Sequence, residues 1–268
     1  MMSQRKRFAV LGSPIGHSLS PKIHNLAYER LGFAGNYEGF EVKAGELSDF
    51  LKTHPADVWS GFSLTMPLKE IALELVTDIE SSAARASSIN TLLPFGNSWQ
   101  GLNTDIFGFR YLFDTFDLLS NESAQVAILG AGGTARAALV ALDGFPGQVS
   151  IYRRSSSRDQ ALKKANPGAE IIDWEFANEA FQADVLINAL PREGIESLRK
   201  TVNSFQQARV IIDALYHPWP TLLSGSARDL FLSGKDLLVA QALRQIELFT
   251  GADLARGEFF KELRASLT

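Results

Sequence analysis

The sequence predicts an α/β protein of two domains, the second of them built on a doubly wound parallel sheet. The chain has 268 residues, enough for two medium domains that each bury a core. In the second half, short apolar runs alternate with helical intervals, which is typical of parallel strands joined by right-handed crossovers. A polar stretch at 120–124 precedes this alternation. We therefore expect one α/β domain at 1–104, completed by C-terminal helices at 238–268, and a second domain at 105–237.

Strands and helices are also mixed in the first half. Proline at the first helical position favours helix starts at Ser20–Pro21 and at Pro67. A Gly-Asn pair between two apolar runs is typical of a β-hairpin. The expected strands are Phe8–Gly12, Tyr37–Val42, Val58–Leu64, Ile89–Leu93 and Ser98–Gly101. The expected helices begin at Ser20, Glu46, Pro67 and Asn103. The helix that begins at Pro67 is expected to cover LKEIALELV, and the last helix to extend to about Leu119.

Five buried strands are expected in the second half, and a helical tail follows them. The strands are Val126–Leu129, Val149–Tyr152, Ile171–Asp173, Val185–Asn188 and Val210–Ala214. The tail, Leu237–Leu248 and Gly257–Leu267, extends beyond this sheet, so we expect it to pack on the first domain.

Composition excludes several classes of protein. The chain is 46% hydrophobic and 21% charged, as is usual for globular proteins. A net charge of −4 argues against a nucleic-acid surface. With no cysteine, the chain has no disulfide, thiolate-bound metal or thiol nucleophile. No apolar run is long enough to span a membrane, and no apolar segment of the length expected in a signal peptide follows the basic start. We expect no metal site and a cytoplasmic location.

A glycine-rich turn follows Val126–Leu129 and opens a helix. Gly130, Gly132 and Ala135 have the G-x-G-x-x-A spacing of a dinucleotide-binding turn. The free N–H groups and the positive dipole end of the helix attract phosphates. This context predicts a Rossmann-type nucleotide site, and the alternative is a tight strand–helix turn without a ligand. The residues expected to line the site are Gly130, Ala131, Gly132, Gly133 and Thr134.

The tip of the next strand favours NADP over NAD. An NAD site usually carries Asp or Glu about 20 residues after the glycines, where it binds the ribose hydroxyl. In this chain the strand Val149–Tyr152 is followed by Arg-Arg-Ser-Ser-Ser-Arg. Guanidinium and hydroxyl groups there can bind a 2′-phosphate, although a solvated basic loop is the alternative. The candidates are Arg153, Arg154, Ser155 and Arg158.

Polar segments in the first half have both structural and functional interpretations. Ser18 and Ser20 could bind a carboxylate, but Ser20 could instead cap a helix. Lys69 falls in the first turn of a helix, where the dipole disfavours a cation and so favours release of the ammonium proton. Such a position suits a proton-transferring lysine, and a solvated lysine is the alternative. Asn90 lies in an apolar context, and Asp105 starts a helix that it could equally cap.

Six motifs occur together and in a fixed order along nearly the whole chain. They are G-S-P-I-G-H-S-L-S-P (Gly12–Pro21), T-M-P-L-K (Thr65–Lys69), I-N-T (Ile89–Thr91), N-T-D-x-x-G-F (Asn103–Phe109), G-A-G-G-T-A-R-A (Gly130–Ala137) and V-A-Q-A (Val239–Ala242). In this order they resemble the shikimate dehydrogenase family.

The resemblance implies roles for the residues of these motifs. Lys69 and Asp105 would be the catalytic pair. Ser18, Ser20 and Tyr216 would bind the substrate carboxylate. The ring hydroxyls would be held by Thr65, Asn90, Asp105 and Gln241, with Lys69 also in contact with the substrate. The family's phosphate-binding loop maps onto Arg153–Arg158, and Ala214 and Gly234 would lie beside the nicotinamide.

The implied reaction is the reversible NADP-dependent reduction of 3-dehydroshikimate to shikimate, a step of aromatic amino-acid biosynthesis, by a monomer or homodimer. Ser63-Leu64 replaces the family's usual Asn-Val, Ser88-Ile89 its Gly-Ala, and Arg153 its Asn. These departures concern substrate preference and 2′-phosphate geometry. By resemblance, serine rather than threonine at Ser20 favours shikimate over quinate. The alternatives are a quinate/shikimate or aminoshikimate dehydrogenase, and a non-catalytic NADP(H)-binding regulatory module.

Overall fold

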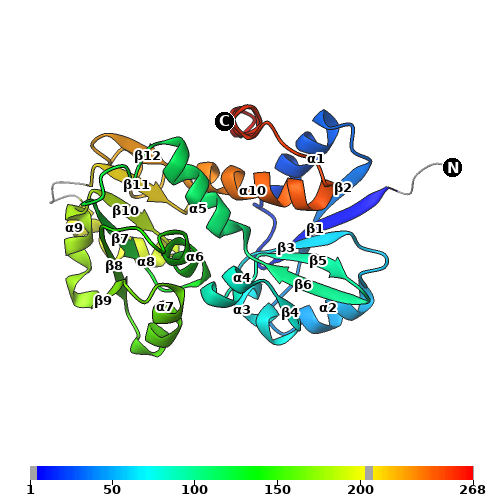
Figure 1. Ribbon diagram of the computed structural model, residues 1–268, viewed down its shortest axis with the longest axis horizontal. Helices are drawn as coiled ribbons and strands as arrows, with labels where there is room; N and C mark the ends of the chain where they lie inside the picture. The colour runs from blue at the N-terminus through cyan, green and yellow to red at the C-terminus, as the bar shows by residue number, and fades with distance from the viewer. Residues whose placement is uncertain (1–4, 203–207, 268) are drawn as a thin grey trace. The chain divides into compact units, whose positions relative to one another are not determined.

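The computed structural model describes residues 5–202 and 208–267. The chain divides into two compact units (Figure 1). The first unit comprises Met1–Thr104 and Val239–Thr268, and the second comprises Asp105–Leu238.

A six-stranded mixed sheet forms the centre of the first unit, in the order β2-β1-β3-β5-β6-β4. β1 pairs in parallel with β2 and β3, whereas β5 is antiparallel to both β3 and β6. A two-residue turn joins β5 to β6, and Gly96 in it has φ +59°, so the predicted hairpin is confirmed. The strands are β1 (Lys6–Gly12), β2 (Gly35–Glu41), β3 (Gly61–Leu64), β4 (Asp78–Ile79), β5 (Thr91–Phe95) and β6 (Ser98–Leu102).

Helices of the first unit come from both ends of the chain. They are α1 (Ser20–Arg30), α2 (Leu47–Thr53), α3 (Leu68–Ile71) with the 3₁₀ turn η1 (Ala72–Glu74), α4 (Ser81–Ala86), most of α10 (Gly234–Thr250) and α11 (Arg256–Ala265). α11 packs on α1, where Arg30 forms ion pairs with Glu258 and Glu262. Glu247 of α10 accepts hydrogen bonds from Arg256 at 2.7 and 3.0 Å, which links α10 to α11.

Three local expectations for the first unit are wrong. Ser20 is the first residue of α1 rather than its cap, since the N-cap is Leu19. The strand predicted from Val58 begins only at Gly61, because the N–H groups of Val58 and Trp59 both donate to Pro55 O and close a turn. The helix after Pro67 has four α-helical residues before it tightens into η1.

A buried histidine lies in the aromatic core of the first unit. The ring of His24 stacks on Tyr37 with centroids 4.0 Å apart. Its Nδ1 lies 2.9 Å from Ser20 O. Because a carbonyl oxygen only accepts, Nδ1 carries the proton of the imidazole. Burial lowers the pKa of His24 to about 4, against a weaker opposing effect of its hydrogen bond to Ser20 O. His24 is therefore neutral near pH 7.

We expect this histidine to make the fold sensitive to acid. Between pH 6.5 and 4 the unfolded chain binds a proton at His24 that the folded chain does not bind, so the free energy of unfolding falls as the pH falls. Between pH 7 and 5 the loss is about 2 kcal/mol. Urea unfolding of His24→Phe, which keeps an aromatic ring against Tyr37, should show a smaller difference between these pH values. An equal difference in both proteins would contradict the prediction.

The second unit has a six-stranded, wholly parallel sheet in the order β12-β11-β10-β7-β8-β9 (Figure 1). Numbered from its first strand, this is the 3-2-1-4-5-6 order of the Rossmann fold, and the predicted doubly wound sheet is confirmed. The order reverses between β7 and β10. The strands are β7 (Gln125–Leu129), β8 (Gln148–Arg153), β9 (Glu170–Asp173), β10 (Val185–Asn188), β11 (Val210–Asp213) and β12 (Leu230–Leu232).

The helical segments of the second unit begin with α5, whose first residue, Thr104, still belongs to the first unit. α5 ends before the predicted Leu119, and Asp117 beyond its end has a left-handed φ of +51°. α6 presents alanines to the core, and Ala135, Ala137 and Ala138 are fully buried. The segments are α5 (Thr104–Thr115), α6 (Gly133–Ala141), η2 (Ser156–Arg158), α7 (Asp159–Ala165), η3 (Trp174–Gln182), α8 (Arg192–Glu196) and α9 (Arg199–Val202).

Candidate active site

In the first unit, the loops that follow β1 and β3 are held against each other. Thr65 N donates to Leu11 O at 2.9 Å, and Ser13 N donates to Met66 O at 3.0 Å. A Cβ atom on Gly12 would lie 2.3 Å from Thr65 Cγ2. Glycine is therefore required at this position for Thr65 to lie beside the end of β1.

The loop that carries Ser18 is fastened at its start to the end of β2. Glu41 accepts hydrogen bonds from the Ser13 hydroxyl at 2.6 Å and from Ile15 N at 2.9 Å, and both bonds lower the pKa of its carboxyl group. Further along, Ser18 Oγ accepts a long bond of 3.4 Å from Ser20 N. The two predicted carboxylate-binding serines are thus adjacent at the start of α1, with Ser18 half-buried and Ser20 buried.

Lys69 is half-buried in the second position of α3. Its carbonyl oxygen accepts a bond of 2.8 Å from Ile89 N, and Leu64 N donates to Asn90 O at 2.7 Å. These two main-chain bonds bring Thr65, Lys69 and Asn90 together. The sequence predicts that a helix dipole disfavours the charge of Lys69. This repulsion is weak, because α3 has four residues and few peptide dipoles add up in so short a helix.

The side chain of Asn90 caps α5. Its Oδ1 accepts from Thr104 N at 2.8 Å, and its Nδ2 donates to Thr104 Oγ1 at 3.1 Å. The Thr104 hydroxyl donates in turn to Gln241 Oε1 at 2.9 Å. Asn90 and Gln241, which lie far apart in the sequence, are therefore joined through one threonine. Asp105 is the next residue; it is buried and begins the second unit.

In the second unit, the glycine turn lies at the carboxyl end of β7, where the strand order reverses. Gly130 has φ +107°, and a Cβ atom there would lie 3.1 Å from Ala189 O. Gly132 has φ −79° and ψ −176°, ordinary extended angles, and a Cβ atom would meet no atom within 4 Å. The fold therefore requires glycine at Gly130, whereas the space in front of Gly132 is open to a ligand.

Arg136 supports this turn, and the sequence reasoning gave it no role. Its side chain is buried at 1% exposure, and its Nη1 donates to Ala131 O at 2.8 Å. The available signal was an arginine at a position whose helical neighbours three and four residues on, Leu139 and Val140, are apolar. The bond from Arg136 holds the backbone of the turn at Ala131.

The predicted phosphate-binding arginines differ in their environments. Arg153 forms ion pairs with Asp159 and Asp173. Its hydrogen bonds to these carboxylates raise the pKa of its guanidinium, and the bond to Asp159 has the larger effect. The Arg154 guanidinium lies over Trp174, 4.6 Å from the ring centroid, and donates to Ser197 Oγ at 3.2 Å. Ser155 bonds with Ser157 through their hydroxyls, and Arg158 is exposed at the start of α7. The positive charge of Arg153 is thus largely balanced by carboxylates.

Asp213 organises the segment that follows β11. Its carboxylate accepts bonds from Asn188 Nδ2 at 2.8 Å, Thr221 Oγ1 at 2.6 Å and Leu215 N at 3.1 Å. Burial raises the pKa of Asp213, and these bonds oppose the rise. A Cβ atom on Gly234 would lie 2.5 Å from Ala214 O, so the two residues expected beside a nicotinamide are in contact.

Tyr216 belongs to the same segment of the second unit. Burial raises the pKa of its phenol. The residue lies between Asp213 and Thr221, whose hydrogen bond closes the loop that carries it.

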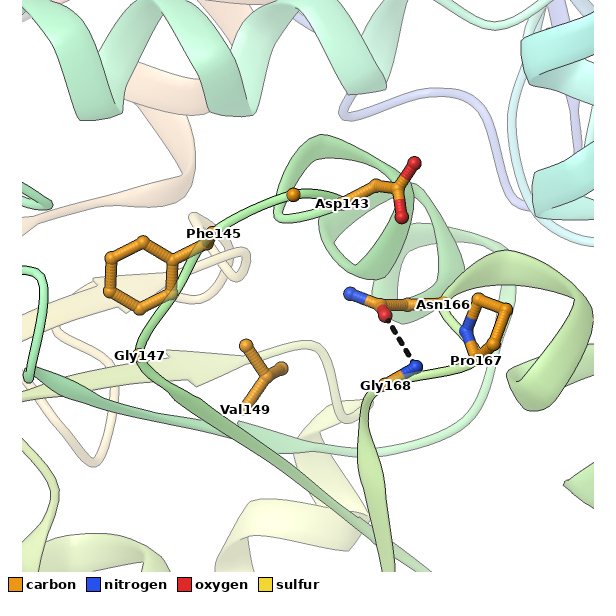
Figure 2. Close-up of a pocket in the computed structure, with 8 residues that line it drawn as sticks. Asp143, Phe145, Gly147, Val149, Asn166, Pro167 and Gly168 are labelled. Atoms are coloured by element: carbon orange, nitrogen blue, oxygen red, sulfur yellow. Dashed lines mark hydrogen bonds between the residues drawn. The ribbon is translucent and has the colours of Figure 1, made fainter.

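The hollow in Figure 2 is lined by none of the predicted site residues. It measures about 300 Å³ and is lined by the loops before β8 and β9, including Asp143, Phe145 and Asn166. These loops lie at the amino end of the sheet, opposite the glycine turn. Among residues 5–202 and 208–267, no group of three or more His, Cys, Asp or Glu side chains could hold a metal ion. Within the same residues, no helix is both long and apolar enough to cross a membrane.

Comparison with known proteins shows which family this chain resembles. The family model of the shikimate dehydrogenase substrate binding domain matches residues 10–92. The shikimate dehydrogenase (NADP(+)) of Oleidesulfovibrio alaskensis is 30% identical over 260 residues, which are 93% of this chain and 91% of the relative. The chain belongs to the shikimate dehydrogenase family. The shikimate dehydrogenase (NADP(+)) of Bacillus subtilis is 31% identical over 261 residues, which are 93% of this chain and 93% of the relative.

Solved structures of shikimate dehydrogenases share the whole fold. The enzyme of Mycobacterium tuberculosis superposes with a TM-score of 0.83 at 33% identity, covering 98% of this chain and 100% of the other. A shikimate 5-dehydrogenase of Thermus thermophilus, solved in complex with NADP(H) and shikimate, gives a TM-score of 0.79 at 28% identity and covers 97% and 99%. The predicted fold class, an N-terminal substrate domain followed by a Rossmann-type NADP domain, is confirmed.

Proposed function

We propose that this chain catalyses the reversible NADP-dependent interconversion of 3-dehydroshikimate and shikimate. One observation carries the proposal: Thr65, Lys69 and Asn90 gather around the loops after β1 and β3, and Thr104 joins Asn90 to Gln241. A cluster of hydroxyl, amide and ammonium groups suits a small ring that bears hydroxyls and a ketone. The matched substrate-binding region, residues 10–92, contains the first three of these residues.

Each group has a chemical task in this proposal. Ser18, Ser20 and Tyr216 bind the substrate carboxylate. Thr65, Asn90, Asp105 and Gln241 hold the ring hydroxyls. When the C3 ketone is reduced, Lys69 donates a proton to the developing alkoxide, and in the reverse direction it accepts that proton from the hydroxyl. Asp105 orients the Lys69 ammonium. These roles are proposals that rest on the residues and on the family pattern.

NADPH supplies the hydride when it is bound. The N–H groups at the start of α6 and the open side of Gly132 fit its pyrophosphate. We assign the pyrophosphate to Gly130, Ala131, Gly132, Gly133 and Thr134. The 2′-phosphate is assigned to the loop of Arg153, Arg154, Ser155 and Arg158, with Arg154 and Arg158 as its main cations, because Arg153 is already paired with two carboxylates. In this assignment Ala214 and Gly234 would lie beside the nicotinamide.

A spectrophotometric assay tests the proposal directly. The purified chain, mixed with shikimate and NADP⁺, should produce reduced nicotinamide, and it should do so faster with NADP⁺ than with NAD⁺. Shikimate should exceed quinate and aminoshikimate in kcat/KM. Absence of turnover with shikimate would overturn the proposed reaction, and a preference for NAD⁺ would overturn the assignment of the basic loop.

The proposal extends to the setting of the enzyme. We place it in the cytoplasm, as a monomer or homodimer whose partners are its small-molecule substrate and cofactor. The net charge of −4 supports the absence of a nucleic-acid partner.

A further inference from the structure

A continuous chain of buried hydrogen bonds crosses the first unit. It begins at Tyr37, whose hydroxyl donates to Ser63 Oγ at 2.5 Å. Ser63 Oγ donates to Gln245 Oε1 at 2.9 Å, and Gln245 Nε2 donates to Thr91 Oγ1 at 2.8 Å. The Thr91 hydroxyl donates to Asn90 Oδ1 at 2.8 Å, from which the chain continues through Thr104 to Gln241. None of its seven members is more than 6% exposed.

Backbone groups fix the orientation of two amides in this chain. Thr104 N can only donate, so the Asn90 atom at 2.8 Å from it must be the carbonyl oxygen Oδ1. The main-chain carbonyl of Asn90 can only accept, so the Gln245 atom at 3.3 Å from it must be the nitrogen Nε2. Rotating either amide by a half-turn would place like groups against each other. Neither orientation is therefore free to reverse.

The hydroxyl protons can then be assigned to their acceptors. Thr91 Oγ1 accepts from Gln245 Nε2, so its single proton goes to Asn90 Oδ1. Thr104 Oγ1 accepts from Asn90 Nδ2, and two acceptors lie within reach of its proton: Gln241 Oε1 at 2.9 Å and Asn90 Oδ1 at 3.3 Å. The shorter of these bonds, to Gln241, continues the chain. All donors consequently run in one direction, which strengthens consecutive bonds in a buried environment. The carbonyl end of the Gln241 amide is committed to Thr104, which sets its nitrogen as the donor end.

We propose that this one-way chain positions Asn90 and Gln241 for the substrate, with Thr91 and Gln245 as positioning residues. The inference rests on the proposed function, in which Asn90 and Gln241 hold ring hydroxyls. Ser63 belongs to the chain at a position where the family usually has asparagine. In this protein the hydroxyls of Tyr37 and Ser63 connect the aromatic core to the substrate-binding amides.

Substitution of Thr91 separates a positioning role from a merely structural one. Thr91→Val keeps the shape of the side chain and removes the hydroxyl, whereas Thr91→Ser keeps the hydroxyl. We expect Thr91→Val to raise the KM for shikimate about tenfold, the effect of one well-formed hydrogen bond, with the KM for NADP⁺ unchanged. Thr91→Ser should restore a KM for shikimate near that of the unsubstituted chain. Shikimate binding measured by calorimetry should weaken in parallel in Thr91→Val only.

Gln245→Met provides a second variant of similar length, with no donor and only a weakly accepting thioether, and it should show the same selective rise in the KM for shikimate. The proposal is overturned if the folded variants bind shikimate as the unsubstituted chain does, if valine and serine at position 91 are equally impaired, or if both KM values rise together. If the unsubstituted chain turns over shikimate and the variants have the same KM for shikimate, the positioning role alone is refuted. Absence of shikimate turnover and binding in the unsubstituted chain refutes the proposed function, and the positioning role with it.

Discussion

Replacement of Lys69 by alanine is expected to lower kcat for shikimate oxidation about a thousandfold and to change the KM for shikimate little. A positioned general acid–base contributes a factor of this order, and its loss affects the transition state more than the ground state. Initial rates at saturating NADP⁺ over a range of shikimate concentrations separate kcat from KM. A variant with turnover near that of the unsubstituted chain would contradict the role proposed for Lys69.

We expect this variant to fold. The Lys69 carbonyl accepts a bond of 2.8 Å from Ile89 N, which links α3 to the segment before β5. Alanine keeps that bond and favours a helix. Lys52, an exposed lysine of α2 in the same unit, provides a matched control. Lys52→Ala should leave kcat and both KM values unchanged, and the thermal unfolding curves of the two variants should be similar.

The second unit was the more predictable part of the fold. Its central strands are buried on both faces, so they appear in the sequence as continuous apolar runs between helices. β4 and β12 were missed because strands of two and three residues are too short to show a period. The late start of the strand predicted at Val58–Leu64, which begins only at Gly61, depends on two bonds to Pro55 O, a contact that strand patterning does not reveal.

The candidate site was predicted less evenly. The types of its residues were visible, but residue patterns alone left each polar segment with a structural alternative. That the Asn90 side chain would bond to the backbone of Thr104, fourteen residues later, follows from the pairing of β5 with β6 and is not visible in local spacing. Arg153 is a second example. Its partner Asp173 lies at the end of the neighbouring strand β9, so the apparent surplus of positive charge at the tip of β8 is partly neutralised.

The cofactor assignment leads to a second large effect, at Gly132. We expect Gly132→Val to raise the KM for NADP⁺ at least tenfold, about 1.4 kcal/mol of binding free energy, while the KM for shikimate changes little. The angles φ −79° and ψ −176° suit a β-branched residue, and a Cβ atom has open space there. The free energy of unfolding should therefore fall by no more than about 1 kcal/mol, the cost of a poorer helix cap.

Two other glycines provide the controls that give this result its meaning. Gly45→Val also places a side chain in open space, but in the first unit, and it should leave the KM for NADP⁺ unchanged. Gly130→Ala forces a Cβ atom onto a backbone with φ +107° and to within 3.1 Å of Ala189 O, so urea unfolding should show a loss of stability. If Gly132→Val bound NADP⁺ as tightly as the unsubstituted chain, no pyrophosphate could lie against this turn. The G-x-G-x-x-A spacing would then reflect only the backbone requirement at Gly130.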